Sequence, residues 1–138
     1  MYFTGKLQRD GKFWMVEVPE LDLATQGKSK KEALEMIADA IETLVNKSDF
    51  KVTVEPTGAK DFILSSNEPA RLMALFLKRQ REAKNLSIRE VAKAMDYAAH
   101  GAYAQYEAGR SMPGIEFIDR FVKTVNPESG LCLTMVRR

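Results

Sequence analysis

Four carboxylates near the start of this 138-residue chain are the side chains best suited to hydrolytic chemistry: Asp10, Glu17, Glu20 and Asp22. A two-metal nuclease holds its Mg²⁺ ions with a cluster of such carboxylates, which the fold must bring to one point. Asp10 precedes Gly11 in a turn signal, and only Glu17 lies within an expected strand. We therefore expect no nuclease, and because no Ser-His-Asp set or Gly-rich phosphate loop is present, no enzyme.

Metal chemistry is also disfavoured by the residue counts. The chain has one histidine, His100, and one cysteine, Cys132. A zinc site built on Cys or on a two-His motif needs more of these ligands, and an internal disulfide needs a second cysteine. The sequence thus predicts no cofactor and no metal, and Cys132 is most simply a small apolar residue.

The residues best suited to binding a partner lie between positions 89 and 111, and they suit DNA. The candidates are Arg89, Ala99, His100, Ala104, Gln105, Arg110 and Ser111. Gln105 can pair bidentately with adenine, whereas Arg89, Arg110 and Ser111 are better placed for phosphates. For His100 two interpretations stay open: it contacts a phosphate or base edge, or it is a polar helix-start residue exposed to water.

Two short helices joined by a tight turn must position these candidates. Ser87 and Glu90 form a capping box that starts the first helix, and Gly109 ends the second. Tyr103 and Tyr106 are three residues apart and are expected on the inner face of the second helix. That placement turns Ala99, His100, Ala104 and Gln105 toward a groove.

This stretch resembles the helix-turn-helix of small repressors. The resemblance rests on L-S-I-R-E-V-A at 86–92 and on Y-E-A-G-R at 106–110. It departs from the pattern at Asp96, where Gly is common, but Asp tolerates the left-handed conformation that such a turn requires. Gly101 stands where a polar, base-contacting side chain is common. The alternative is a helical pair used only for packing or dimerisation.

Charge is divided unevenly along the chain. Residues 1–66 carry 9 Lys/Arg against 11 Asp/Glu, net −2, and residues 67–138 carry 12 against 8, net +4. The second half is therefore the half suited to phosphates, which favours DNA binding over simple packing.

The first half has the pattern of a small α+β layer fold. Residues 2–8 and 13–18 alternate as strands around the hairpin signal Asp10-Gly11. A short strand at 21–26, an amphipathic helix capped by Ser29 and Glu32, and a strand at 52–54 follow, with a further strand at 62–65 before a linker at 65–67. The expected order is β-β-β-α-β.

Four segments of this half resemble the HicB family of antitoxins. They are D-G-K-F-W at 10–14, V-P-E-L at 18–21, T-Q-G-K-S at 25–29 and E-A-L at 32–34. The resemblance implies a reduced ribonuclease H-like domain, and some family members continue into a helix-turn-helix domain, the order expected here. Two partial resemblances in the expected order strengthen each other.

The second half is expected to be helical up to a short tail. A helix begins at Asn67-Glu68-Pro69 with Leu72, Leu75 and Phe76 inward, and a last helix carries Ile115, Ile118, Val122 and Val125 on its inner face. We expect two domains, a toxin-binding domain at 1–66 and a DNA-binding and dimerisation domain at 67–138.

The tail after Gly130 is apolar and β-prone, so we expect a short C-terminal strand. Pairing of this strand with the same strand of a second copy would bury Leu131, Leu133 and Met135. It would give a homodimer, or a tetramer, as binding to two DNA half-sites requires. The alternative is a tail that folds back on its own domain or frays.

These observations favour an antitoxin of a type II toxin–antitoxin pair. The resemblance implies a HicA-like, RNA-cleaving toxin as one partner, and operator DNA is the other. The alternative is a stand-alone transcriptional regulator whose front domain senses a ligand or a protein. The first residues lack a signal-peptide core and no apolar run approaches a membrane span, so we expect a cytoplasmic protein.

Overall fold

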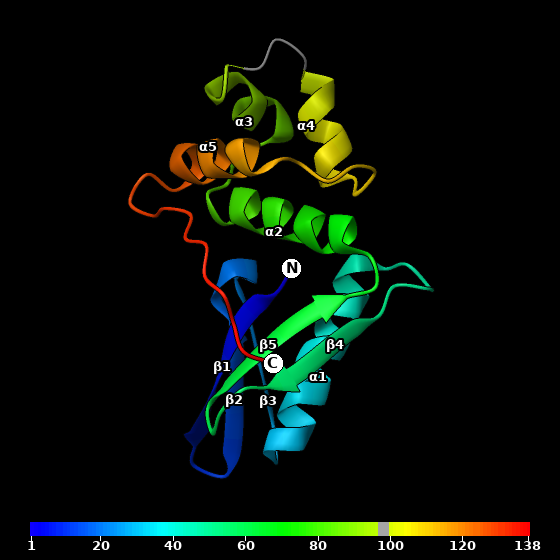
Figure 1. Cartoon of the computed structure of the whole chain (residues 1–138), viewed down its shortest axis with the longest axis vertical. Helices are drawn as coiled ribbons and strands as arrows, with labels where there is room; N and C mark the ends of the chain where they lie inside the picture. The colour runs from blue at the N-terminus through cyan, green and yellow to red at the C-terminus, as the bar shows by residue number, and fades with distance from the viewer. Residues whose placement is uncertain (97–99) are drawn as a thin grey trace. The chain divides into compact units, whose positions relative to one another are not determined.

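The computed structural model describes residues 1–96 and 100–138. They form two compact units, which are described here separately: unit 1 contains Met1–Pro69 with Arg137–Arg138, and unit 2 contains Ala70–Val136. Unit 1 is a sheet with a helix, and unit 2 is helical (Figure 1). The predicted α+β fold is confirmed. No helix in the described ranges has the length and apolar character needed to cross a membrane.

Unit 1 is built on one five-stranded antiparallel sheet. Its elements are β1 (Phe3–Asp10), β2 (Phe13–Val18), a 3-10 turn (Pro19–Leu21), β3 (Leu23–Gly27), α1 (Lys30–Val45), β4 (Val52–Pro56) and β5 (Asp61–Ser66). The strand order is β3-β2-β1-β5-β4. Of the two strands that follow α1 in the chain, β5 therefore pairs with β1, and β4 lies at the edge of the sheet.

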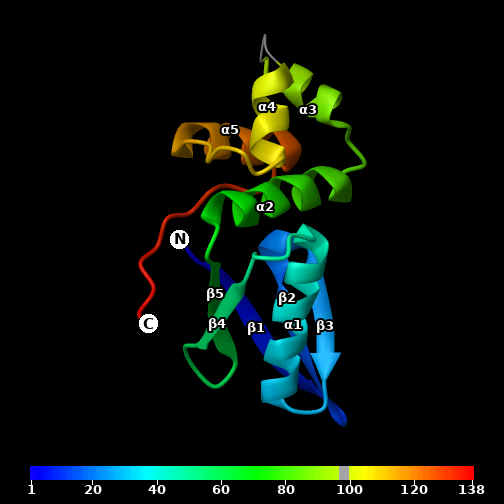
Figure 2. The ribbon, with the colours of Figure 1, turned by 90° about the vertical axis from the view of Figure 1, so that its right-hand side faces the viewer.

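The core of unit 1 lies between the sheet and α1, which runs along one face of the sheet (Figure 2). Leu7 lies opposite Val16 in the β1–β2 register, and both are buried on this face. Ile37 and Ile41 of α1 are fully buried as well. The apolar residues that recur every 3.6 positions in the helix and every second position in the strands thus pack together in one layer.

Gly27 allows the start of α1 to approach the sheet closely. A Cβ at this position would lie 2.5 Å from the backbone nitrogen of Ala33. Because backbone atoms cannot rotate aside as a side chain can, only glycine fits here. This gives a packing reason for the glycine in the T-Q-G segment.

The expected third strand at 21–26 is wrong at its start. Pro19–Leu21 forms a 3-10 turn that ends at Asp22 with φ 49, and β3 begins at Leu23. Proline has no N–H for the strand ladder, and its fixed φ suits the first residue of a turn. Leu21 is nevertheless fully buried. The alternating apolar pattern therefore predicted its burial correctly, although the residue lies in a turn and not in a strand.

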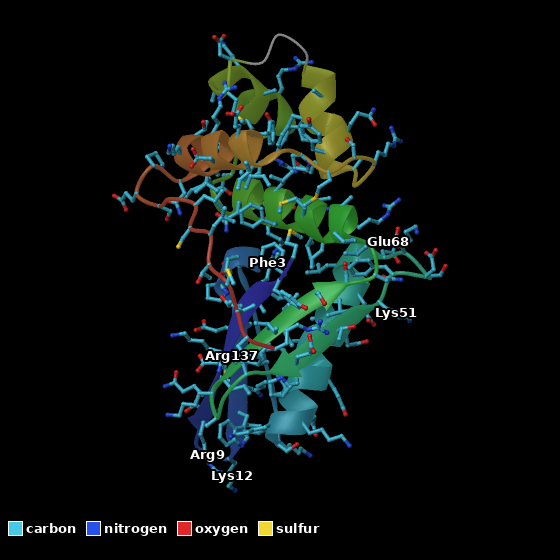
Figure 3. All side chains as sticks on the ribbon, in the orientation of Figure 1. Phe3, Arg9, Lys12, Lys51, Glu68 and Arg137 are labelled. Carbon is cyan, nitrogen blue, oxygen red and sulfur yellow. The ribbon has the colours of Figure 1, made fainter. Side chains whose placement is uncertain are left out.

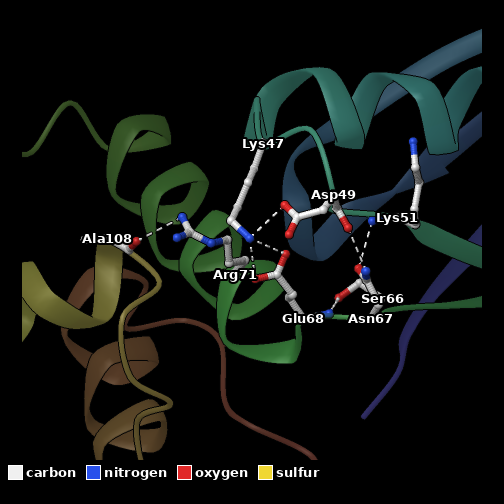
Figure 4. Close-up of polar contacts among 8 residues, drawn as sticks. All are labelled: Lys47, Asp49, Lys51, Ser66, Asn67, Glu68, Arg71 and Ala108. Atoms are coloured by element: carbon white, nitrogen blue, oxygen red, sulfur yellow. Dashed lines mark hydrogen bonds and ion pairs between the residues drawn. The ribbon is translucent and has the colours of Figure 1, made fainter.

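The expected linker at 65–67 is part of unit 1. Ser65 and Ser66 belong to β5, and the Asn67 side chain accepts from Lys51 N at 2.8 Å and donates to Asp49 O at 2.7 Å. Next to it, Lys47 Nζ lies 2.9 Å from Glu68 and 2.8 Å from Asp49 (Figure 4). These bonds hold the segment in a fixed turn, so it is not a flexible linker.

The described residues of unit 2 form the helices α2 (Pro69–Ala83), α3 (Ile88–Ala94), α4 (His100–Glu107) and α5 (Ile115–Val125). Aromatic rings join them, with Phe76 of α2 and Tyr103 of α4 both packed on Phe121 of α5, at centroid distances of 6.1 Å and 5.9 Å. The predicted inner face of α5 is partly wrong, because Ile115 is 50% exposed while Phe117 and Phe121 are buried.

The expected C-terminal strand is wrong for the single chain. The residues after α5 form neither helix nor strand, because a short apolar segment has no partner here for its backbone N–H and C=O groups. Leu133 is 77% exposed and Met135 is 98% exposed. At the end of the tail, Arg138 lies 3.6 Å from Glu55 and over the ring of Tyr2 within unit 1.

Candidate nucleic-acid interface

The first helix of the candidate interface begins as its sequence predicts. Ser87 Oγ accepts from Glu90 N at 3.0 Å, and Glu90 Oε1 accepts from Ser87 N at 3.0 Å, which completes the capping box. The hydrogen bond from the Ser87 backbone N–H lowers the pKa of the Glu90 carboxyl. After α3, Asp96 adopts φ 56, so the left-handed turn predicted for this residue is confirmed.

The second helix, α4, is oriented by its tyrosines. Tyr103 is fully buried between Phe117 and Phe121, and Tyr106 is half-buried with its ring 4.7 Å from that of Phe117. Both contacts are to α5, which confirms that these tyrosines lie on the inner face. Burial, and then the neighbouring Glu107 carboxylate, raise the pKa of the Tyr103 hydroxyl.

The opposite face of α4 exposes Gly101 and Gln105, and Ala108, directly after the helix, extends this stripe to three residues. They are spaced four and three apart, as neighbours on one helix face are. Gln105 is the polar member of the stripe, and Ala104 beside it is half-buried. Of the two predicted groove residues Ala104 and Gln105, the structure turns Gln105 outward more fully.

Two of the predicted DNA contacts cannot be placed on this face. Ala99 lies outside the described residues. The backbone of His100 begins α4, but its side chain lies outside the described part of the structure. Arg89 on α3 and Arg110 and Ser111 after α4 are all exposed. The structure brings Gln105 and Arg110 together at the end of α4, where Arg110 Nη1 lies 3.3 Å from Gln105 Oε1.

The turn that ends α4 has the geometry of a Schellman motif. Arg110 N donates to Gln105 O at 3.2 Å, and Gly109 N donates to Tyr106 O at 3.1 Å. Gly109 has φ 76, a left-handed conformation that favours glycine. A Cβ on Gly109 would also lie 3.1 Å from Arg71 Cγ, so α2 packs directly against this turn.

A salt bridge within the core of unit 2 holds α4 to α2. Arg81 Nη2 lies 2.5 Å from Glu107 Oε1, and the two side chains are only 14% and 6% exposed. Arg81 Nη1 also donates to Leu86 O at 2.7 Å, which ties the loop before α3 to the same guanidinium. The Glu107 carboxylate raises the pKa of Arg81. One guanidinium thus joins α2, the start of α3 and the end of α4.

Comparison with protein families agrees with this geometry. Residues 72–126 match the family model of a helix-turn-helix domain. This stretch is a helix-turn-helix DNA-binding domain. Its presence supports a transcription-regulator-like function. No curated protein matches the chain.

Sequence reasoning missed the residues that brace the helix-turn-helix domain. Glu107 was part of the Y-E-A-G-R segment, but its partner Arg81 is 26 residues away and was not singled out. Arg120 was likewise unassigned, and its Nη2 donates to Met95 O at 2.6 Å at the end of α3. Arg81 and Arg120 could each have been recognised as a charged residue within the apolar pattern of a helix.

No three His, Cys, Asp or Glu side chains among the described residues gather closely enough to hold a metal ion. The four carboxylates considered for a nuclease lie at the end of β1, near the end of β2 and in the 3-10 turn with its cap.

Proposed function

We propose that the chain is the antitoxin of a type II toxin–antitoxin pair and is similar to the HicB antitoxins. The helix-turn-helix domain would bind the operator and repress the shared promoter, and unit 1 would mask a HicA-like, RNA-cleaving toxin in the cytoplasm. The observation that carries the proposal is the helix-turn-helix domain directly after a unit with four HicB-like segments. In this role the chain is not an enzyme and needs no cofactor.

The charge distribution within unit 1 supports a basic protein partner and limits where it binds. The β1–β2 turn, the start of α1 and the β4–β5 turn lie at one end of the sheet, where Figure 3 labels Arg9 and Lys12. Residues 9–14, 27–33 and 57–61 there carry 6 Lys/Arg and 3 Asp/Glu, net +3. The rest of residues 1–66 carries 3 against 8, net −5. A basic toxin is attracted to this second part.

The outer face of α1 is the best candidate for the toxin contact in this acidic part. Glu35 and Asp39 are exposed one helical turn apart. Met36, which follows Glu35 directly, is 41% exposed although it is a large apolar side chain. Leu44 is 42% exposed and lies farther along the helix, on the side of Ile37 and Ile41. A basic protein surface with an apolar centre would be complementary to this face, because the face combines carboxylates with an exposed apolar side chain.

Unit 1 alone is expected to neutralise the toxin. Residues 1–69 should restore growth when expressed with the small open reading frame adjacent to this gene, and should co-purify with its product. The fragment ends at Pro69 because Asn67 and Glu68 are bonded into unit 1. A folded fragment that leaves growth arrested, or the absence of a toxin gene, would favour the alternative of a stand-alone regulator that senses a ligand or protein.

Base recognition is expected to depend on Gln105. Gln105→Ala should weaken operator binding by about 1–3 kcal/mol and relax one base position, because Gln105 is the exposed polar side chain of the α4 stripe. Arg89→Ala should weaken binding to all sequences alike, since an exposed arginine on α3 suits phosphates. Fluorescence anisotropy on the operator and on single-base variants measures both.

The salt dependence provides the control for these two variants. The slope of log affinity against log salt should fall by about one for Arg89→Ala and stay unchanged for Gln105→Ala. Equal operator affinity for Gln105→Ala and the parent would refute the assignment of Gln105.

The tail is expected to hold two copies together as an antiparallel ribbon. Leu131, Leu133 and Met135 would share its buried face, which accounts for their exposure in the single chain. Leu133→Asp with Met135→Asp should convert the dimer to monomer and reduce binding to paired half-sites. Sedimentation velocity measures the first effect and operator titration the second.

The matched control places the same charges on the other face of the ribbon. Cys132→Asp with Thr134→Asp should leave the dimer intact, and both double variants keep the Arg138 contact with Glu55. If Leu133→Asp with Met135→Asp remains dimeric, the tail is not the contact and unit 1 becomes the candidate.

A further inference from the structure

The Schellman turn after α4 fixes the backbone of Arg110 next to Gln105. Two backbone hydrogen bonds close the turn, and the left-handed Gly109 packs against Arg71 of α2. Arg71 Nη1 also lies 3.5 Å from Ala108 O, as drawn in Figure 4. The packing of unit 2 therefore fixes the Cα position of Arg110 before any DNA is bound.

From this position Arg110 reaches the one exposed polar side chain of the α4 stripe. Arg110 Nη1 donates a hydrogen bond to Gln105 Oε1 at 3.3 Å. The carbonyl oxygen of the amide is thereby identified, because a guanidinium has no acceptor and can bind only the oxygen. The amide nitrogen of Gln105 is left on the side away from Arg110.

This orientation changes which base Gln105 can recognise. A bidentate pair with adenine uses both the amide oxygen and the amide nitrogen. Arg110 occupies one of the two lone pairs of the oxygen and fixes the amide so that its two N–H groups lie away from Arg110. In the major groove guanine presents two acceptors, N7 and O6, whereas adenine presents one acceptor beside a donor. An amide that approaches the bases with its N–H groups therefore favours guanine.

We propose that Arg110 is a positioning residue that holds the Gln105 amide with its nitrogen toward the groove, so that Gln105 recognises guanine. The proposal rests on DNA binding by the helix-turn-helix domain and concerns the same site. It differs from a phosphate contact by Arg110, which would strengthen binding to every sequence and would not depend on Gln105.

A double-mutant cycle in the full chain separates the two roles. The parent, Arg110→Met, Gln105→Ala and the double variant are each used to select duplexes from a randomised library, and affinities are then measured on duplexes differing at the selected position. In the parent we expect guanine at the position governed by Gln105. Arg110→Met should reduce the preference for guanine over adenine by about tenfold. In the Gln105→Ala background it should not change base preference at all.

Arg89→Met is the matched control, since it removes one exposed arginine from the same domain. It should lower affinity for all duplexes alike and leave the selected base unchanged. The proposal is overturned if the parent selects adenine at this position, or if Arg110→Met weakens all duplexes equally in both backgrounds. If the parent selects no sequence, sequence-specific operator binding fails and this inference fails with it; selection without coupling overturns this inference alone.

Discussion

Glu107→Gln is expected to lower the free energy of unfolding of unit 2 by about 3 kcal/mol, because breaking a buried ion pair on one side leaves an uncompensated charge. Arg81 stays charged, and its side chain is only 14% exposed, so water can replace little of what the carboxylate supplies. The end of α4 would lose its attachment to α2. Operator binding should fall with it, since Gln105 lies on the same helix.

Urea unfolding followed by the helical circular dichroism signal measures this effect. Trp14, the single tryptophan of the chain, lies in unit 1, and its fluorescence transition is expected to shift less than the helical signal. Asp119→Asn is the matched control. It removes the same charge from the exposed pair with Lys123 and should cost no more than about 0.5 kcal/mol.

A second variant separates the charge effect from a loss of packing. Arg81→Met with Glu107→Leu replaces both partners with apolar side chains, and it should recover much of the lost stability, because no unpaired charge remains. If Glu107→Gln is no more destabilising than Asp119→Asn, the salt bridge does not hold α4 in place.

Local rules predicted much of the helix-turn-helix domain correctly. The capping box of Ser87 and Glu90 depends on residues three apart, and the left-handed turn at Asp96 depends on one residue's tolerance for positive φ. Both can be recognised without knowing the tertiary structure. The inward position of Tyr103 followed from helical spacing in the same way.

The errors arose where a distant partner decides the outcome. Ile118 and Val125 of the predicted α5 stripe are buried, but Ile115 is exposed, and aromatic packing on Tyr103 buries Phe117 and Phe121. The tail has strand propensity, yet a strand forms only with a partner. The bond between Arg110 and Gln105 could not be predicted, because it depends on the Schellman turn and its packing on Arg71.

Glu35→Lys with Asp39→Lys is expected to abolish neutralisation of the toxin. The double reversal changes the charge at these two positions by four, from two negative to two positive, and places like charges opposite a basic toxin. Like-charge contacts across an interface cost several kcal/mol, which exceeds the affinity that a small apolar contact at Met36 can restore. Both substituted side chains are exposed, so unit 1 should keep its fold.

Growth on co-expression with the adjacent open reading frame tests this directly, and pull-down of its product measures binding. Asp10→Lys with Glu17→Lys is the matched control, because it makes the same charge change at two exposed positions of the β1–β2 hairpin and leaves α1 unchanged. Growth arrest with the α1 variant and rescue with the control would place the toxin on α1. Equal loss in both would mean that net charge, not the α1 face, governs the attraction. Rescue by both would exclude α1 as the contact.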